Sequence, residues 1–225
     1  MAEVLIVQHA PGEGPGTLAG VLEARGLSSR TVHPGRGESL PTTPGAGLVI
    51  LGGGMSVTAM DRAPHLYDEL KLIDLALRNQ VPVLALCLGS QLLAHALGAR
   101  VSRAPQLELG WFPVRLAEAA RTDPLWARLP TAFTAFHWHE DEFELPAGAA
   151  RLAESDRCRN QAYRFGTNAY GIQFHPEVDE AVLAAMAEGG DAALREAVLG
   201  PAPRLLPLWQ PSARQLFDAW AQLTI

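Results

Sequence analysis

Cysteine is scarce in this chain of 225 residues, which contains only Cys87 and Cys158. The two lie far apart in different sequence contexts, which excludes the dense disulfide framework of a small secreted domain. Residues 1–7 (MAEVLIV) have no basic segment and no small-residue cleavage site after a long apolar stretch, and this argues against a secretory signal. Both features predict a protein of the reducing cytoplasm.

Basic residues are also few, since 18 Lys and Arg stand against 24 Asp and Glu, for a formal net charge of −6. This balance disfavours nucleic acid and membrane surfaces as partners. Residues 81–99 contain no Lys, Arg, Asp or Glu, and the length of this run approaches that of a membrane span. Because Pro82, Gly89, Ser90 and Gly98 interrupt the run, we expect a buried strand, a turn and a helix there.

Apolar runs of strand length alternate with stretches of helical period in the first half of the chain. Leu66, Leu70, Ile73 and Leu77, for example, fall on one helical face. The alternation predicts an α/β fold with a mostly parallel, twisted sheet and helices on both faces. With 48% hydrophobic residues, the chain is expected to form one domain over residues 1–225. The expected strands are 4–7, 48–51 and 81–86, and the expected helices are 18–24, 66–77 and 91–97.

The second half of the chain has shorter strands separated by turns, with a hairpin expected around residues 166–168 (GTN). These strands predict a small antiparallel section of the sheet. A helical segment is expected from about residue 179, in which the proline-rich stretch 200–211 is interpreted as a linker to the last helix. Trp111, Phe112 and Trp209 are compatible with the core or with exposed anchors. The expected strands are 114–116, 133–138, 161–165 and 169–174, and the expected helices are 181–188, 192–199 and 215–223.

Cys87 stands between a predicted strand and a predicted helix. Such a turn resembles a nucleophile elbow, which exposes a reactive side chain at the carboxyl edge of a parallel sheet, although Ala85 replaces the usual first glycine. Unpaired N–H groups at the helix start stabilise a thiolate, and the N–H of Leu88 would point at an oxyanion formed by attack from Cys87. The alternative is that Cys87 is simply a small buried hydrophobic residue.

The best candidate base for this cysteine lies in residues 171–177 (GIQFHPE). Alternation along an extended chain would place His175 and Glu177 on one side, where the carboxylate could orient the imidazole and stabilise the imidazolium. The alternative is a histidine that merely ends a strand, followed by an acid that begins a helix.

Two other features have less support as functional sites. His137 and His139 have a spacing that could present both as metal ligands on a strand, but no further Cys or His pairs with them at ligand spacing, so no metal site is expected. Cys158 lies in a charged, loop-like context and is interpreted as structural or incidental, although its flanking arginines hint at a more reactive thiol.

Three segments together carry a resemblance to a known family: residues 51–56 (LGGGMS), 86–91 (LCLGSQ) and 171–177 (GIQFHPE). In this order they resemble the class I, triad-type glutamine amidotransferases, and they are similar to the glutaminase domain of GMP synthases and its free-standing relatives. The resemblance covers nearly the whole chain up to just past Glu177 and implies a flavodoxin-like or Rossmann-like sheet. It also implies a triad of Cys87 as nucleophile, His175 as general base and acid, and Glu177 as its orienting partner.

The same resemblance implies an oxyanion hole formed by the backbone N–H groups of Gly53 and Leu88. It further implies a glutamine pocket in which residues 138–141 (WHED) help to hold the α-amino and α-carboxylate ends of the substrate. Two positions depart from the family pattern, because Glu140 replaces a frequent glycine and Gly54 a frequent proline. The implied pocket residues are Gly54, Gln91, Trp138, His139, Glu140 and Asp141.

The activity implied by the resemblance is hydrolysis of the glutamine side-chain amide through a glutamyl thioester, with release of ammonia and no metal or organic cofactor. The chain contains no G-x-x-x-x-G-K-[ST] nucleotide-binding pattern, so a separate synthase that accepts the ammonia is the expected partner. Two alternatives stay open. One is a free-standing γ-glutamyl hydrolase or peptidase with the same triad, and the other is a catalytically silent binding or regulatory module.

Overall fold

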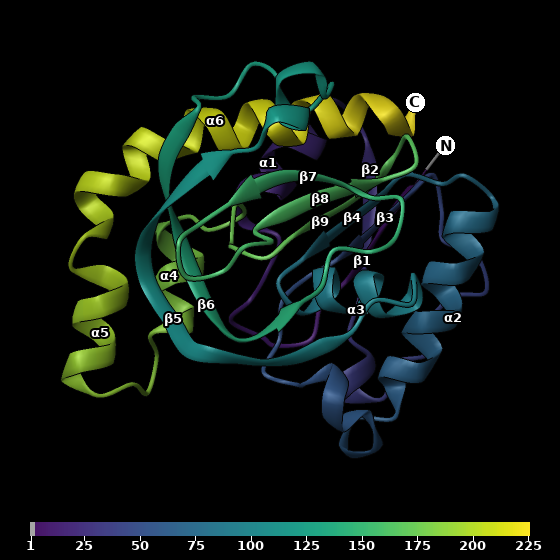
Figure 1. Ribbon diagram of the computed structural model, residues 1–225. Helices are drawn as coiled ribbons and strands as arrows, with labels where there is room; N and C mark the ends of the chain where they lie inside the picture. Colours follow the sequence, from purple (N-terminus) through teal and green to yellow (C-terminus); the bar gives the residue numbers. More distant parts are fainter. Residues whose placement is uncertain (1–2) are drawn as a thin grey trace.

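A mixed sheet runs through the centre of the molecule, with helices packed around it (Figure 1). The computed structural model describes residues 3–225, so Met1 and Ala2, which begin the predicted domain, lie outside the described residues. Within the described part the sheet has nine strands, in the order β2-β1-β3-β4-β9-β8-β7-β5-β6. The strands are β1 (Glu3–Val7), β2 (Ser28–Val32), β3 (Gly47–Ile50), β4 (Val83–Leu86), β5 (Val101–Leu116), β6 (Ala132–Phe143), β7 (Ala150–Glu154), β8 (Ala162–Phe165) and β9 (Ala169–Ile172). The α-helices are α1 (Gly16–Ala24), α2 (His65–Arg78), α3 (Leu88–Ala96), α4 (Glu180–Met186), α5 (Ala192–Leu199) and α6 (Ala202–Ala221).

Strands β2, β1, β3, β4 and β9 form the parallel part of the sheet. Alternate residues face opposite sides, so Val4 and Ile6 of β1 belong to one apolar core, and Leu5 and Val7 to another. Helices α1 and α6 cover the first core, and α2 and α3 cover the second (Figure 1). The predicted α/β fold with helices on both faces of the sheet is confirmed.

Strands β8, β7, β5 and β6 form the antiparallel part, and the hairpin predicted around residues 166–168 joins β8 to β9. This part is larger than the predicted strands suggest, because β5 (16 residues) and β6 (12 residues) form a long, curved ribbon (Figure 1). Pro105 and Pro113 interrupt the sequence signal of β5, yet both occupy exposed positions. Strands β2 and β7 were not predicted, and the first three residues of β2 are exposed and carry no apolar pattern.

The interpretation of residues 200–211 as a linker is wrong, because α6 begins at Ala202 and continues through residue 211 without interruption. Pro203 lies in the first turn, where a backbone N–H is not needed, whereas Pro207 and Pro211 each remove one helical hydrogen bond. All three prolines are exposed, and the opposite side of the helix packs on the sheet. Burial of this apolar stripe outweighs a penalty of about 3 kcal/mol for each interior proline. The stripe consists of Leu206, Trp209, Ala213, Leu216, Phe217 and Trp220.

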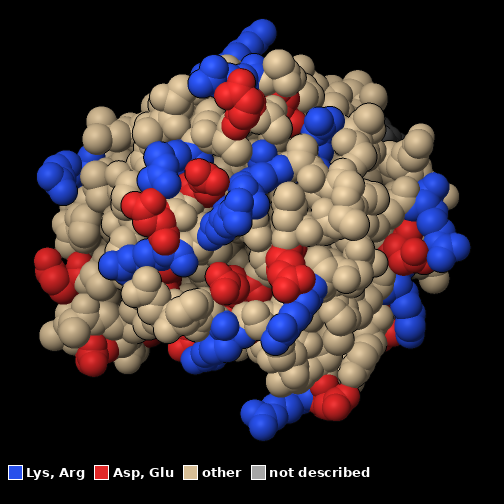
Figure 2. Space-filling model, in the orientation of Figure 1, with Lys and Arg blue, Asp and Glu red and all other residues tan. Residues whose placement is uncertain are grey.

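Residues 81–99 contain β4, a turn and α3, as predicted, and Trp209 is a core residue that stacks on Phe133 at 4.4 Å between ring centroids. Over residues 3–225, no helix is both long and apolar enough to cross a membrane. On the face shown in Figure 2, acidic and basic side chains are interspersed.

Candidate active site

Cys87 lies in the turn between β4 and α3, at the carboxyl edge of the parallel strands. Its backbone has φ 49° and ψ −108°, a strained conformation for a residue other than glycine and one that is frequent at functional sites. The N–H of Cys87 donates to the backbone oxygen of Ile172 at 2.8 Å, and the N–H of Gln91 donates to the oxygen of Cys87 at 3.2 Å. The strand–turn–helix geometry predicted for this cysteine is therefore present.

Gly89 allows the first turn of α3 to cross directly over β3. A Cβ atom at this position would lie 2.3 Å from the backbone oxygen of Ile50, so only glycine fits. The hydroxyl of Ser90 donates to the backbone oxygen of Cys87 at 2.6 Å. These contacts fix the helix start beside the thiol, where its dipole stabilises a negative charge.

His175 and Glu177 form a buried pair close to this turn. Nδ1 of His175 lies 2.8 Å from Oε1 of Glu177, and each side chain is 1% exposed. Cε1 of His175 and Cβ of Cys87 lie 3.0 and 3.5 Å from the point that a Cβ of Gly52 would occupy, so the two side chains meet over this glycine. Burial lowers the pKa of His175, but the negative charges of Glu177 and Cys87 outweigh this effect and hold the pKa well above its ordinary value.

The segment that carries this pair is a turn and not the extended chain from which the pairing was predicted. Strand β9 ends at Ile172, and the chain bends until the N–H of His175 donates to the backbone oxygen of Phe136 in β6 at 2.9 Å. Helix α4 begins at Glu180, with Asp179 as its N-cap. The alternative interpretation of Glu177 as an acid that begins a helix is therefore wrong.

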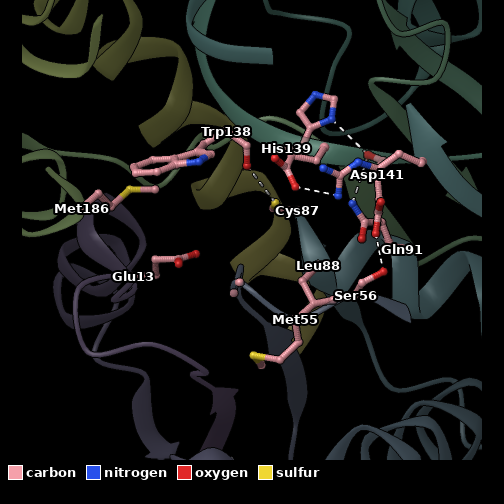
Figure 3. Close-up of a pocket in the computed structure, with 14 residues that line it drawn as sticks. Glu13, Met55, Ser56, Cys87, Leu88, Gln91, Trp138, His139, Asp141 and Met186 are labelled. Atoms are coloured by element: carbon pink, nitrogen blue, oxygen red, sulfur yellow. Dashed lines mark hydrogen bonds and ion pairs between the residues drawn. The ribbon is translucent and has the colours of Figure 1, made fainter. Parts of the chain in front are cut away.

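A pocket of about 280 Å³ opens beside Cys87 (Figure 3). Sγ of Cys87 lies 3.6 Å from the backbone oxygen of Trp138, and Nε2 of Gln91 donates to the backbone oxygen of Asp141 at 3.3 Å. All residues predicted for the oxyanion hole and the substrate pocket line this pocket, whereas His175 and Glu177 do not line it. The predicted lining residues are Gly53, Gly54, Leu88, Gln91, Trp138, His139, Glu140 and Asp141.

Several lining residues were missed in the sequence. Arg103 of β5 forms an ion pair with Glu140 at 2.6 Å, and the hydroxyl of Ser56 donates to the carboxylate of Asp141. Ser56 ends the LGGGMS segment, so its position was a usable signal, but Arg103 belongs to no local motif. The unpredicted lining residues are Glu13, Met55, Ser56, Arg103 and Met186.

A second buried pair, His9 and Glu69, supports the glycine-rich segment at the pocket. Nδ1 of His9 donates to the backbone oxygen of Gly52 at 2.9 Å, and its Nε2 lies 2.8 Å from Oε2 of Glu69. Both side chains are 0% exposed. Burial lowers the pKa of His9, but the hydrogen bond and charge of Glu69 outweigh it, so the pKa is raised. Since a carbonyl and a carboxylate can only accept, both nitrogens of this imidazolium donate.

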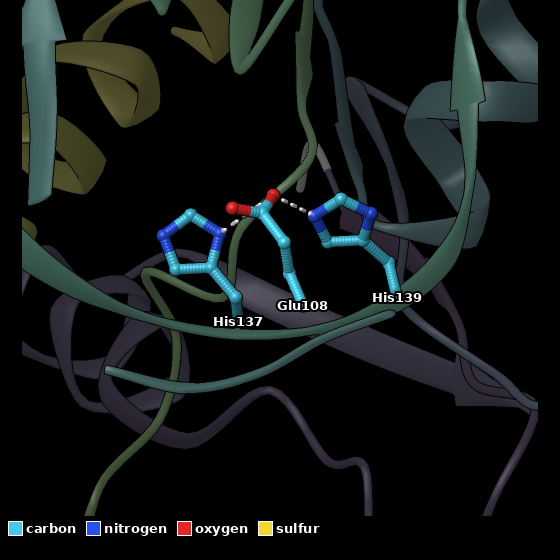
Figure 4. A group of neighbouring side chains, drawn as sticks. All are labelled: Glu108, His137 and His139. Carbon is cyan, nitrogen blue, oxygen red and sulfur yellow. Dashed lines mark ion pairs between the residues drawn. The ribbon is translucent and has the colours of Figure 1, made fainter. Parts of the chain in front are cut away.

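Glu108, His137 and His139 form a buried cluster on the ribbon (Figure 4). Their ligand atoms lie within 4.8 Å of one another, so these residues could hold a metal ion, and Glu108 is a third candidate ligand that the sequence spacing did not indicate. Oε2 of Glu108 lies 2.8 Å from Nε2 of His139 and also accepts a hydrogen bond from Gln161 at 2.9 Å. Burial and the neighbouring His139 hold the pKa of His137 well below its ordinary value, so His137 is neutral at pH 7.

Cys158 has a different environment from Cys87. It is 2% exposed, and burial raises the pKa of its thiol to about 12. The prediction that Cys158 is structural or incidental fits this environment, and the flanking arginines do not activate the thiol.

The fold and the pocket define an α/β protein with a buried cysteine–histidine–glutamate site at the carboxyl edge of its sheet. A family model described as "Glutamine amidotransferase class-I" matches residues 22–185. The chain belongs to the class I glutamine amidotransferase family, as the resemblance of its three segments predicts.

Individual proteins agree with this assignment. The glutamine amidotransferase-like protein YfeJ of Salmonella typhimurium is 36% identical over 181 residues, which cover 77% of this chain and 75% of that protein. One subunit of the glutamine-hydrolysing GMP synthase of Methanocaldococcus jannaschii is 37% identical over 117 residues, which cover 51% of this chain and 61% of that polypeptide. A crystal structure of a glutamine amidotransferase from Thermotoga maritima matches with a TM-score of 0.89 at 29% identity, over 99% of this chain and 98% of that chain.

Proposed function

We propose that the protein hydrolyses the side-chain amide of glutamine and releases ammonia, with Cys87, His175 and Glu177 as its catalytic triad. The observation that carries this proposal is the position of the bonded His175–Glu177 pair beside the strained turn of Cys87. A nucleophile, a base and a group that orients the base are the three parts that such a reaction requires. Membership of the class I family supports the same conclusion.

In the proposed reaction the thiolate of Cys87 attacks the amide carbon, and the N–H groups of Gly53 and Leu88 stabilise the oxyanion. The imidazolium of His175 gives its proton to the amide nitrogen as the C–N bond breaks, and ammonia leaves a glutamyl thioester. His175 then takes a proton from water, whose oxygen attacks the thioester. The C–S bond breaks, glutamate leaves, and the thiolate–imidazolium pair is restored.

The remaining lining residues are suited to the zwitterionic end of the substrate. The carboxylates of Glu140 and Asp141 suit the α-ammonium group, and the guanidinium of Arg103 suits the α-carboxylate. Gln91 is fixed by its bonds to the backbone of Asp141 and to Gln173, so its amide is held at the pocket wall. Gly54 and His139 complete this part of the proposed pocket.

The names of the relatives bear on the partner of the reaction. Several are named as one subunit of a GMP synthase, and we propose that a separate synthase likewise receives the ammonia from this chain. Cys87 and Cys158 are both free thiols, as is typical of proteins in a reducing compartment, so we propose that the reaction takes place in the cytoplasm. A second candidate activity is hydrolysis of γ-glutamyl amides of larger amines by the same triad, and it is favoured by the carboxylate of Glu13, which lies in the pocket and has no bonding partner among the described residues.

The experiment is a mass-spectrometric measurement of glutamate released from glutamine and from γ-glutamyl amides. Cys87→Ala should abolish release, and Glu177→Ala should leave weak activity, because the base remains but its orientation is lost. Cys158→Ala is the matched control, since it removes the other buried thiol and should leave the rate unchanged. Equal rates for wild type and Cys87→Ala would overturn the proposal.

If the enzyme is inactive without a synthase, a covalent label can still test whether Cys87 is a reactive nucleophile. A chloroketone analogue of glutamine should add one equivalent of label, and peptide mapping should place it on Cys87. Binding of glutamine without labelling or turnover would instead support a silent binding module.

A further inference from the structure

Glu13 is an acidic residue of the pocket to which the proposed triad gives no role. It lies in the loop between β1 and α1, whose sequence is QHAPGEGP over residues 8–15. In Figure 3, Glu13 lies on the same side of Cys87 as Trp138 and Met186, while Gln91 and Asp141 lie on the other side. We call the group of Glu13, Trp138 and Met186 the leaving-amine subsite.

The loop is tightly fastened to the elements that carry the triad. The N–H of Thr17 donates to the backbone oxygen of Glu177 at 2.8 Å. Gly16 has φ +42°, and a Cβ there would meet the same oxygen, so glycine is required for this approach. On the other side of Glu13, the side chain of Gln8 donates to the backbone oxygens of Ala10 at 2.8 Å and Pro11 at 3.3 Å. Glu13 is therefore held in the pocket by a loop whose position these hydrogen bonds fix.

The carboxylate of Glu13 lies near the proposed base and makes no bond of its own. Its Oε2 lies 2.5 Å, and Cε1 of His175 lies 3.0 Å, from the point that a Cβ of Gly52 would occupy. Over residues 3–225, no hydrogen bond or ion pair reaches this carboxylate. Burial and the charge of Glu177 raise its pKa, although the charges of His175 and His9 oppose them, and a further cation in the pocket would stabilise the ionised form.

We infer that Glu13 binds a protonated nitrogen on the leaving amine, so that among γ-glutamyl amides of larger amines, the second candidate substrates, this site prefers those of diamines. The inference rests on the proposed function, because His175 must deliver its proton to the leaving nitrogen, and this nitrogen therefore lies on the side of His175 and Glu13. The ring of Trp138 suits a cation as well, since its face carries negative charge. The hydrolysis consumes water and yields glutamate and the free diamine.

Three γ-glutamyl amides of nearly equal length test the inference: those of ethylenediamine, propylamine and glycine, whose tails are cationic, neutral and anionic. For wild type, kcat/KM should be about tenfold or more higher for the cationic than for the neutral amide, as expected for one charge-assisted hydrogen bond, and lowest for the anionic amide. Glu13→Gln should bring the cationic-to-neutral ratio close to one. Glu140→Gln, which removes a carboxylate that is paired with Arg103, should leave this ratio as in wild type.

Binding measurements separate this inference from the proposed hydrolysis. In the Cys87→Ser background, calorimetry should show tighter binding of the cationic than of the neutral amide, and Glu13→Gln should remove the difference. Hydrolysis without any preference for the cationic amide would overturn the role of Glu13 and leave the triad intact. Preferential binding without hydrolysis would overturn the proposed reaction and leave the subsite intact. A ratio that Glu13→Gln does not change would overturn the subsite in either assay.

Discussion

Replacement of the buried pair of His9 and Glu69 should slow amide hydrolysis while leaving substrate binding nearly intact. Nδ1 of His9 donates to the carbonyl of Gly52, which belongs to the same peptide group as the N–H of Gly53. Because the C=O and N–H of a trans peptide are fixed in one plane and point in opposite directions, a bond on the carbonyl orients and polarises the N–H. The proposed oxyanion donor at Gly53 therefore depends on His9.

The size of the effect follows from the bonds involved. A hydrogen bond from a charged donor contributes about 1.5–3 kcal/mol, and loss of a whole oxyanion donor lowers kcat by roughly 10²–10³. The N–H of Gly53 remains when His9 is replaced, so we expect kcat to fall by about tenfold to a hundredfold. Glu69→Gln should lower kcat less, because the new amide can donate to Nε2 of a neutral His9. The hydrogen then stays on Nδ1, which continues to donate to the carbonyl of Gly52. The kcat of this variant should fall by less than about tenfold.

The assay compares kcat, KM and Tm of wild type, Glu69→Gln and the double variant His9→Leu/Glu69→Met. Replacing both partners with apolar residues avoids leaving one charge buried alone, which would destabilise the fold by about 3–5 kcal/mol. The expected order of kcat is wild type, then Glu69→Gln, then the double variant, with similar KM values. A folded double variant with the wild-type kcat would refute the role assigned to His9.

Two further predictions concern the base and the elbow. The charge of Glu177 holds the pKa of His175 above its ordinary value, so Glu177→Gln should lower this pKa. The high-pH limb of kcat/KM, where the imidazolium paired with Cys87 loses its proton, should then move to lower pH, and a limb that stays in place would contradict the assignment. Gly89→Ala forces a Cβ to 2.3 Å from a backbone oxygen, whereas Gly54→Ala meets no atom within 4 Å. Gly89→Ala should destabilise the protein by about 1–3 kcal/mol and lower Tm by several degrees, whereas Gly54→Ala should leave Tm unchanged. Equal Tm values for the two variants would contradict the packing argument.

The inner parallel strands β3 and β4 could be predicted because they are buried on both faces and read as unbroken apolar runs. Strand β2 has no such run, since Ser28, Ser29 and Arg30 are exposed at the edge of the sheet. In α6 the local sequence is misleading, because its prolines predict an interruption of the helix. The helix is maintained by packing of side chains such as Trp209 and Trp220, and this tertiary contribution has no local signature.

Within the candidate site, the residues that could be predicted lie in short motifs that hold several chemical groups together. His175 and Glu177 are two positions apart, so their pairing is visible locally. His9 and Glu69 are 60 positions apart, and neither has a neighbour in sequence that reveals the other. Their contact arises only when α2 packs beside the carboxyl ends of β1 and β3. The same holds for Glu13, whose loop reads as an ordinary turn of glycine and proline.

His175 has two carboxylates near it, and the difference in their bonding separates their roles. Oε1 of Glu177 lies 2.8 Å from Nδ1, whereas the carboxylate of Glu13 lies on the Gly52 side of the ring and has no bonding partner within residues 3–225. Burial and the charge of Glu177 raise the pKa of Glu13, and the charge of His175 opposes them, so a further cation beside this carboxyl group would stabilise its charged form. Ammonia leaves as a neutral molecule and cannot balance that charge, whereas an amine with a second, protonated nitrogen can. Among the γ-glutamyl amides of larger amines, the position of Glu13 therefore favours those whose leaving group carries a second, protonated nitrogen.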